Sequence, residues 1–250
     1  MHVQAYKTDK ITVGSHQLFA VLDAALPPLS ENSVVAVAAK IVSLCEGRAV
    51  PIADADKDAL IAQESQRYLS RSASKYDVSF TITRNMLVPS AGVDESNADG
   101  YYVLWPADLQ ASANAIREYL RQRDGLKTLG VVLTDSVTRP LEWGTTGGAI
   151  AYSGFVPLKN YIGSDDLFGR KLEYHTASIA NGVAAAATLV MGEGSEQTPL
   201  AVIQDIPFVI FQDHTPTQAE LESLKIEPTD DLYWPLLSNA PWQPGESTQS

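Results

Sequence analysis

The sequence predicts a mixed fold of helices and strands, built as one large domain or two small ones. The chain has 250 residues, enough to bury a full hydrophobic core without disulfides or a structural metal. Its composition, with 45% hydrophobic and 19% charged residues, is that of an ordinary globular protein. Segments with the periodicity of helices are interspersed with short apolar runs typical of buried strands. Together these observations predict an ordered protein in which both kinds of element pack around a core.

The first half of the chain predicts two helices and a strand. Leu18 to Leu26 has helical spacing and stops before Pro27 and Pro28, because proline cannot continue a helix. Val34 to Ala38 is a compact run of β-branched and small apolar residues, short enough for a buried strand. Lys57 to Leu69 has an apolar and a polar face and predicts a second helix.

The second half contains the two clearest helices. Ala107 to Arg123 carries apolar residues at helical spacing between Pro106 and Gly125. Ser178 to Met191 shows the same spacing, with Gly192 as the natural stop. Strands are predicted at Leu129 to Leu133, Pro199 to Ile203 and Phe208 to Phe211. Prolines break the pattern after Asp213, and residues 245–250 are predicted to form a disordered tail.

Charge, cysteine usage and hydropathy narrow the classes of function. Cys45 is the only cysteine, so no intrachain disulfide and no cysteine-built metal site can form, which fits a reducing compartment. No leader-like segment or bilayer-spanning stretch is evident, so we expect a cytoplasmic protein that does not enter a membrane. The formal charge of −12, without clusters of Lys or Arg, argues against nucleic-acid binding. An acidic protein can still bind a nucleotide through backbone amides and divalent cations.

Two aspartates follow apolar runs and lie among small or hydroxylated residues. Asp94 lies in a loop of small side chains, residues 90–97, where backbone and ligand could approach closely; a turn or helix cap is the alternative. Asp135 precedes Ser136 at the end of a predicted strand, where a carboxylate beside a hydroxyl can hold Mg²⁺ or Mn²⁺ bridging phosphate oxygens. A loop aspartate that caps the next turn is the alternative, and both interpretations stay open.

Two glycine-rich stretches could contact phosphates. Glu193 lies between Gly192 and Gly194, whose amides could bind an anion while the carboxylate binds a hard cation. The end of the preceding helix explains Gly192 equally well. Gly144 to Gly148 is a second possible phosphate or substrate loop, with a flexible connection as its alternative.

Other chemistries find less support. The four histidines are isolated, without the spacing of a zinc site. The sequence contains no Walker-type loop, no dinucleotide-binding glycine pattern and no nucleophile elbow. Cys45 follows an apolar run and is predicted to be buried packing rather than a nucleophile.

At these residues the sequence resembles the CofE family, ligases that add γ-linked glutamate to the deazaflavin coenzyme F420. Five ordered blocks carry the resemblance: VVAVAAKIVSLCEGR (34–48), AGVDESN (91–97), VVLTDSVTR (131–139), IGSDDLFGRKL (162–172) and LVMGEG (189–194). The resemblance implies an α+β fold with mixed, largely antiparallel sheets and packed helices. It also implies a single ligase domain over residues 1–244, with two intertwined subdomains as the alternative.

The resemblance further implies GTP or ATP as co-substrate, two divalent ions, Mg or Mn, and a homodimer with the site near the subunit interface. Asp94 and Asp135 match the family's first metal site, and Ser136 and Glu193 match the second. The predicted catalytic residues are Asp94, Asp135 and Arg139, and we expect Arg139 and Arg170 to bind an anionic group of substrate or nucleotide. The positions that match nucleotide contacts are Lys40, Ser43, Asn97, Met191, Gly192, Gly194, Ser195 and Glu196.

The chain departs from the family pattern where cations are expected. Leu44 stands where family members usually carry Lys, and Glu142 and Trp143 occupy a region that often holds two arginines. The stretch from Ile206 onward looks like a branch proposed to act in folate metabolism. The predicted reaction is therefore the addition of L-glutamate to a carboxylate of a folate or a deazaflavin through an acyl phosphate. The alternative is a non-catalytic nucleotide- or cofactor-binding member of the family.

Overall fold

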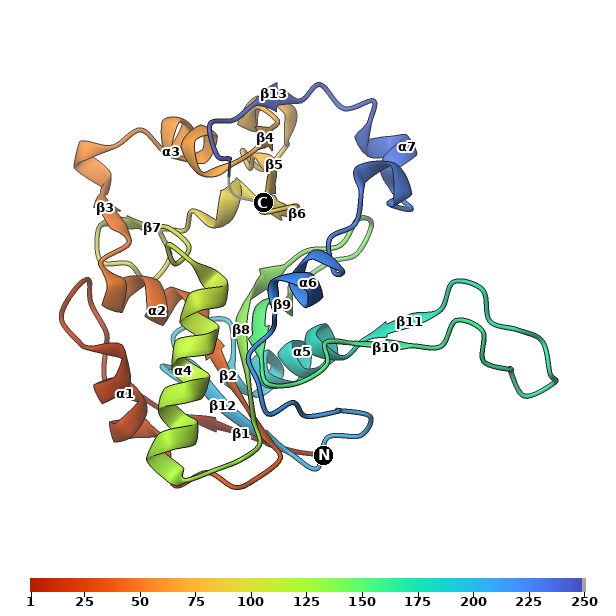
Figure 1. Ribbon diagram of the computed structural model, residues 1–250. Coiled ribbons are helices and arrows are strands. Elements are labelled where there is room, and N and C mark those ends of the chain that lie inside the picture. Colours follow the sequence, from red (N-terminus) through yellow and green to blue (C-terminus); the bar gives the residue numbers. More distant parts are fainter. Residues whose placement is uncertain (249–250) are drawn as a thin grey trace. The chain divides into compact units, whose positions relative to one another are not determined.

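The computed structural model describes residues 1–248, which form two compact units (Figure 1). Unit 1 comprises residues 1–46 and 106–215, and unit 2 comprises residues 47–105 together with the chain from residue 216 onward. Each unit is assembled from two separate segments of the chain. No single linker divides them, which is why the composition shows none.

Unit 1 is built on a five-stranded sheet in the order β1, β12, β2, β8, β9. The strands are β1 (His2–Tyr6), β12 (Leu200–Gln204), β2 (Ser33–Ala38), β8 (Leu129–Val137) and β9 (Thr146–Ser153). Strands β2 and β8 pair in parallel, whereas the other three pairings are antiparallel. The side chains of β2 from Val34 to Val37 are fully buried, as expected for a central strand that is covered on both faces.

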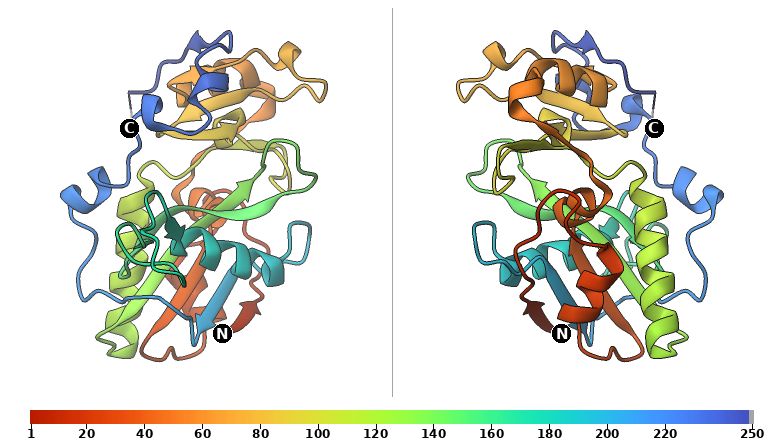
Figure 2. Two further views of the ribbon diagram at one scale, coloured as in Figure 1. Left: turned by 90° about the vertical axis from the view of Figure 1, so that its right-hand side faces the viewer. Right: turned by 90° about the vertical axis from the view of Figure 1, so that its left-hand side faces the viewer.

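Helices cover both faces of this sheet. Helix α5 (Ile179–Met191) lies on one face, and α1 (Leu18–Ala25), α2 (Ala39–Glu46) and α4 (Leu109–Asp124) lie on the other (Figures 1 and 2). The side chain of Asp108 caps α4 by accepting from the Ala111 amide at 2.9 Å, and Gly125 ends the helix in the left-handed conformation. The polar side chain before the helix and the glycine after it thus set the limits of α4.

A hairpin and a second set of sheets complete the structure. In unit 1, β10 (Leu158–Asn160) pairs with β11 (Thr176–Ser178) at the base of a long excursion (Figure 1). Unit 2 contains an antiparallel sheet of β13 (Gln243–Pro244), β4 (Arg67–Tyr68), β5 (Phe80–Thr83) and β6 (Met86–Pro89), and the pair β3 (Ala49–Pro51) and β7 (Tyr101–Val103). Its helices are α3 (Lys57–Glu64), α6 (Gln218–Glu222) and α7 (Trp234–Leu237). Short 3-10 turns lie at η1 (Ile52–Asp54), η2 (Arg71–Ala73), η3 (Ser90–Gly92) and η4 (Pro228–Asp230). The predicted α+β class with largely antiparallel sheets is confirmed.

Most predicted helices and strands are present, but one predicted helix is too long and one predicted strand is wrong. The helix expected over residues 57–69 ends at Glu64, and Arg67 and Tyr68 instead pair with β5 and β13. The strand expected over residues 208–211 is absent from the described chain apart from an isolated bridge between Phe155 and Phe211. Local periodicity cannot detect these outcomes, because strand pairing depends on partners distant in sequence.

The described C-terminal residues are held by hydrogen bonds within unit 2. Backbone amides of Gly245, Glu246 and Ser247 donate to carbonyls of residues 66, 62 and 65, which differs from the predicted disordered tail over residues 245–250. Residues 249 and 250 lie outside the described part. Within residues 1–248, no helix is both long and apolar enough to cross a bilayer.

Candidate functional site

The candidate site in unit 1 begins at the carboxyl end of β8. Asp135 and Ser136 lie within the last three residues of this strand, which extends beyond the predicted end at Leu133. Asp135 pairs with Gly148 of β9, and Ser136 pairs with Gly147. Asp135 is half-buried, and its carboxylate Oδ1 accepts a hydrogen bond from the Ser136 amide at 2.9 Å. Regular strand pairing therefore fixes the backbone of both residues.

Ser136 and Glu193 lie 57 positions apart in sequence but are in direct contact. The Ser136 hydroxyl donates to Oε2 of Glu193 at 2.5 Å. Glu193 reaches this position because α5 ends at Met191 and Gly192 turns the chain with a φ of 81°. Both residues are exposed, so the carboxylate and hydroxyl oxygens remain accessible to a ligand. The structure thus brings together two of the four predicted metal ligands.

Asp135 is directed away from this contact. Successive strand residues face opposite sides of a sheet, and the paired glycines show which side each faces. A Cβ atom at Gly147, opposite Ser136, would lie 2.1 Å from Oγ1 of Thr188 in α5, whereas one at Gly148, opposite Asp135, would lie 2.5 Å from Val137. Ser136 therefore faces α5 and Asp135 faces the other side, an arrangement that suits two separate cations better than one.

The donor atoms at the end of β8 match a hard divalent cation. In residues 1–248, no three His, Cys, Asp or Glu side chains gather into a group that could hold a metal. Ser136 and Glu193 supply a hydroxyl and a carboxylate on one side of β8, and Asp135 supplies a carboxylate on the other. All are oxygen ligands of the kind that Mg²⁺ and Mn²⁺ prefer. Mg²⁺ commonly keeps several waters and completes its coordination with substrate phosphates. Each side of the strand end therefore supplies part of a coordination shell that phosphate oxygens would complete, which fits two implied divalent ions.

The glycines at positions 147 and 148 have a structural role that the sequence analysis missed. The sequence allows Gly144 to Gly148 to be a phosphate or substrate loop, but residues 147 and 148 belong to β9. Because any side chain at Gly147 would collide with Thr188, the glycine allows α5 to pack closely on the sheet. A glycine pair inside a strand pattern was the signal that could have indicated this close approach.

The loop that carries Glu193 is closed at its base. The Thr198 hydroxyl donates to the Met191 carbonyl at 2.5 Å, and the Gly192 amide donates to the Thr188 carbonyl at 2.9 Å. Inside the loop the Gly194 amide donates to Oε2 of Glu196 at 2.8 Å. Met191 itself is buried, whereas residues 192–197, including Ser195, are exposed. Four of the predicted nucleotide-contacting residues, Gly192, Gly194, Ser195 and Glu196, thus belong to one compact loop, and a fifth, Met191, ends the helix before it.

In unit 2, Asp94 forms the turn that the sequence left as an alternative. Its Oδ1 accepts from the Ser96 amide and its Oδ2 from the Ser96 hydroxyl, both at 2.8 Å. The backbone of Asp94 also forms an antiparallel bridge with Val103. Asn97 is exposed and has a positive φ of 53°. The loop therefore presents a half-buried carboxylate on an ordered frame.

Lys40 and Ser43, the first two of the predicted nucleotide contacts, lie in α2. Lys40 is half-buried near the start of this helix. The Ser43 side chain is only 1% exposed, and its hydroxyl donates to the Ala39 carbonyl at 3.1 Å. Leu44, which replaces an expected lysine, is 4% exposed and packs in the interior. In this conformation Ser43 and Leu44 stabilise the helix and its packing, and neither presents a polar group to solvent.

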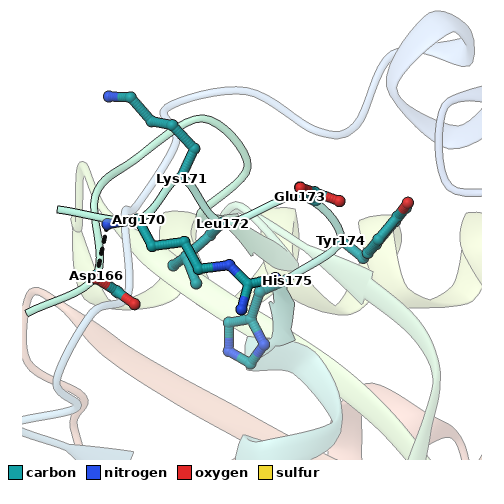
Figure 3. Close-up of a pocket in the computed structure, with 7 residues that line it drawn as sticks. All are labelled: Asp166, Arg170, Lys171, Leu172, Glu173, Tyr174 and His175. Atoms are coloured by element: carbon teal, nitrogen blue, oxygen red, sulfur yellow. Dashed lines mark hydrogen bonds between the residues drawn. The ribbon is translucent and has the colours of Figure 1, made fainter. Parts of the chain in front are cut away.

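The predicted anion-binding arginines lie in two exposed segments of unit 1. Arg139 follows β8, and its Nη1 lies 4.0 Å from a carboxylate oxygen of Glu142. Arg170 lies on the excursion between β10 and β11, where it lines an open pocket of about 340 Å³ (Figure 3). The other lining residues are Asp166, Lys171, Leu172, Glu173, Tyr174 and His175. Of the predicted site residues, only Arg170 lines this pocket.

Cys45 has the properties predicted for a packing residue. Its side chain is half-buried in α2, and burial together with the neighbouring Glu46 raises the pKa of the thiol to about 11. The thiol is therefore protonated at neutral pH, whereas a nucleophilic cysteine needs its thiolate form.

Comparison with known proteins identifies relatives of the whole segment that carries these residues. The family model described as F420-0:Gamma-glutamyl ligase matches residues 7–205. The Coenzyme F420:L-glutamate ligase of Methanosarcina barkeri is 32% identical over 196 residues, covering 72% of this chain and 76% of the relative. The enzyme of that name from Methanopyrus kandleri is 33% identical over 195 residues, covering 71% and 77%. The one from Methanococcus maripaludis is 32% identical over 204 residues, covering 75% and 81%. All predicted site residues, from Lys40 to Glu196, fall within the matched range.

Proposed function

The chain belongs to the F420-0:Gamma-glutamyl ligase family, and from this premise we propose that it forms an amide bond between L-glutamate and a carboxylate of a folate or deazaflavin acceptor, with GTP or ATP and Mg²⁺ or Mn²⁺. As a γ-glutamyl ligase it is an acid–amino-acid ligase. The contact between Ser136 and Glu193 is the observation that carries the proposal. It joins two oxygen donors from distant blocks at a strand end and a glycine-containing loop.

The reaction needs a co-substrate because a free carboxylate is a poor acyl donor. In the first step an acceptor carboxylate oxygen attacks the γ-phosphorus, the bond to the bridging oxygen breaks, and the nucleoside diphosphate leaves. In the second step the glutamate amine attacks the acyl carbon and loses a proton, and the C–O bond to phosphate breaks. No covalent enzyme nucleophile is required, which agrees with the protonated thiol of Cys45.

The chain's own residues act by position and charge. Asp135 and Glu193 place carboxylates on two sides of the β8 end, and Ser136 fixes the orientation of Glu193 through its hydroxyl. Divalent cations, when bound, supply neutralisation of charge on the triphosphate, the main electrostatic requirement of phosphoryl transfer. Asp94 is proposed as a further metal ligand, and Lys40, Ser43 and Asn97 as nucleotide contacts, because these positions match those of the family. Arg139 and Arg170, both exposed, are proposed to bind anionic groups of the substrates.

The acceptor can be identified by one assay. We expect the purified protein, incubated with glutamate, Mn²⁺, GTP or ATP and either a folate or F420-0, to add one or more glutamyl units and release one nucleoside diphosphate per bond. Mass spectrometry of the acceptor and quantification of the diphosphate measure the two products. A product with F420-0 alone would assign the deazaflavin activity, and a product with folate alone would assign the folate branch.

The same assay tests the alternative of a non-catalytic member. Two features favour this alternative: Leu44, which buries an apolar side chain where a lysine is usual, and Glu142, which stands where the family often has an arginine. Tight nucleotide binding without any glutamylated product, under both acceptor conditions, would support a binding role and contradict the proposed ligase activity.

The proposal includes a homodimer, which exposed apolar side chains of unit 1 support. Leu141 and Trp143 in the loop after β8 are 107% and 93% exposed, and Leu167 and Phe168 on the β10 to β11 excursion are 97% and 95% exposed. Exposed groups of apolar residues are typical of interaction surfaces. We expect sedimentation equilibrium to give twice the 27.0 kDa chain mass, and Phe168→Ser to shift the equilibrium toward monomer. A wild-type protein that sediments as a monomer at assay concentrations would contradict this part of the proposal.

A further inference from the structure

The most informative feature beyond the proposed reaction is the fold-back of Glu196 inside the loop that follows α5. Its carboxylate accepts from the Gly194 amide at 2.8 Å. A Cβ atom at Gly192 would lie 2.6 Å from Cδ of Glu196, and one at Gly194 would lie 3.3 Å from both carboxylate oxygens. The two glycines therefore provide the space in which the carboxylate lies, in addition to ending the helix.

The contact is the one that an external anion would make. A backbone amide in a glycine-containing loop is a common donor to phosphate oxygens, and a carboxylate oxygen accepts from it in the same geometry. The Glu196 carboxylate and a nucleotide phosphate oxygen cannot occupy the same donor. An anion that uses the Gly194 amide must first displace Glu196.

The negative charge around this loop further disfavours the binding of a phosphate while Glu196 is in place. The loop lies at the carboxyl end of α5, where the helix dipole places partial negative charge, and α5 has no basic residue in its last turn. Glu193 adds a further negative charge in the same loop. A nucleotide phosphate can therefore bind here only together with cations and after Glu196 has moved.

We propose that Glu196 is an internal anion that occupies the Gly194 amide until a nucleotide phosphate replaces it. This inference rests on the proposed function, because it assumes that the loop binds a nucleotide. It assigns Glu196 a role opposite to that of a nucleotide contact: the side chain competes with the phosphate. The rest of the loop is held by the Thr198 and Gly192 hydrogen bonds, so Glu196 can leave without opening the base of the loop.

The test is a binding measurement with Glu196→Gln. Glutamine keeps the size and can still accept from Gly194, but it is uncharged and a weaker acceptor. We expect the Kd for GTP and ATP, measured by calorimetry with Mn²⁺ and without glutamate or acceptor, to fall about threefold to tenfold. The matched control is Glu227→Gln, which removes the same charge from an exposed position in another segment and should leave the Kd unchanged.

Hydrogen exchange gives a second readout that does not depend on affinity. In the nucleotide-free protein the Gly194 amide should exchange faster in Glu196→Gln than in the wild type, and nucleotide should slow it in both. An unchanged Kd would show that Glu196 only fills the loop, and a weaker affinity would show that it contacts the nucleotide or its metal; either result overturns the inference. If neither the wild type nor Glu196→Gln bound GTP or ATP, the proposed use of a nucleotide would be overturned, and this inference with it.

Discussion

Asp135→Asn is expected to lower kcat for glutamate addition at least about 100-fold, a loss of about 2.7 kcal/mol of transition-state stabilisation. The substitution removes the carboxylate charge at the end of β8 while keeping the size of the side chain. Pairing of Asp135 with Gly148 uses the backbone, so strand register is unaffected. The asparagine carbonyl can also still accept from the Ser136 amide, as Asp135 does at 2.9 Å. The loss of activity would therefore result from removal of the carboxylate charge and not from a change in the fold.

This experiment needs both an activity and a stability measurement. The thermal unfolding midpoint of Asp135→Asn should stay close to that of the wild type. Asp230→Asn makes the same change in the exposed η4 turn and should retain full turnover. If Asp135→Asn kept wild-type rates with saturating Mg²⁺ or Mn²⁺, the site at the end of β8 would not be the catalytic one.

Gly154→Ala should produce the largest loss of stability, about 3–5 kcal/mol from steric overlap together with backbone strain. Gly154 has a φ of 79°, and a Cβ atom there would lie 2.1 Å from Nε of Arg117 and 2.2 Å from the Leu129 carbonyl oxygen. Arg117 is only 1% exposed and donates to the carbonyls of Leu129 at 2.8 Å and Gln212 at 2.9 Å. An alanine would therefore disturb the hydrogen bonds of a buried cation as well as the backbone.

The control for this prediction separates strain from overlap. Gly163 also has a positive φ, 84°, but no atom lies within 4 Å of a Cβ built there. Gly163→Ala should cost about 1–2 kcal/mol, the strain alone. Urea denaturation of both variants measures the difference, and equal losses would mean that the packing around Arg117 yields to a methyl group.

Local sequence signals predicted helices α1, α4 and α5 of unit 1 and strands β2, β8 and β12 of its sheet, but not helix α2. The ends of these helices could be predicted because single residues encode the capping and stop signals, such as Gly125 after α4 and Gly192 after α5. The β2 strand was readable because a strand covered on both faces requires a continuous apolar run, which residues 34–38 provide. The Arg67 and Tyr68 pair was misassigned to a helix, since its strand conformation depends on β5 and β13.

For the candidate site, the sequence by itself determined which residues carry the oxygen donors and which family the chain resembles. Short motifs record chemistry, and five ordered blocks are specific enough to identify relatives. Only the tertiary structure decided that Ser136 and Glu193 are in contact, that Asp135 faces the other side of β8, and that Glu196 lies on the Gly194 amide. Such facts depend on strand register and on where α5 ends against the sheet, and both are set by packing between segments distant in sequence.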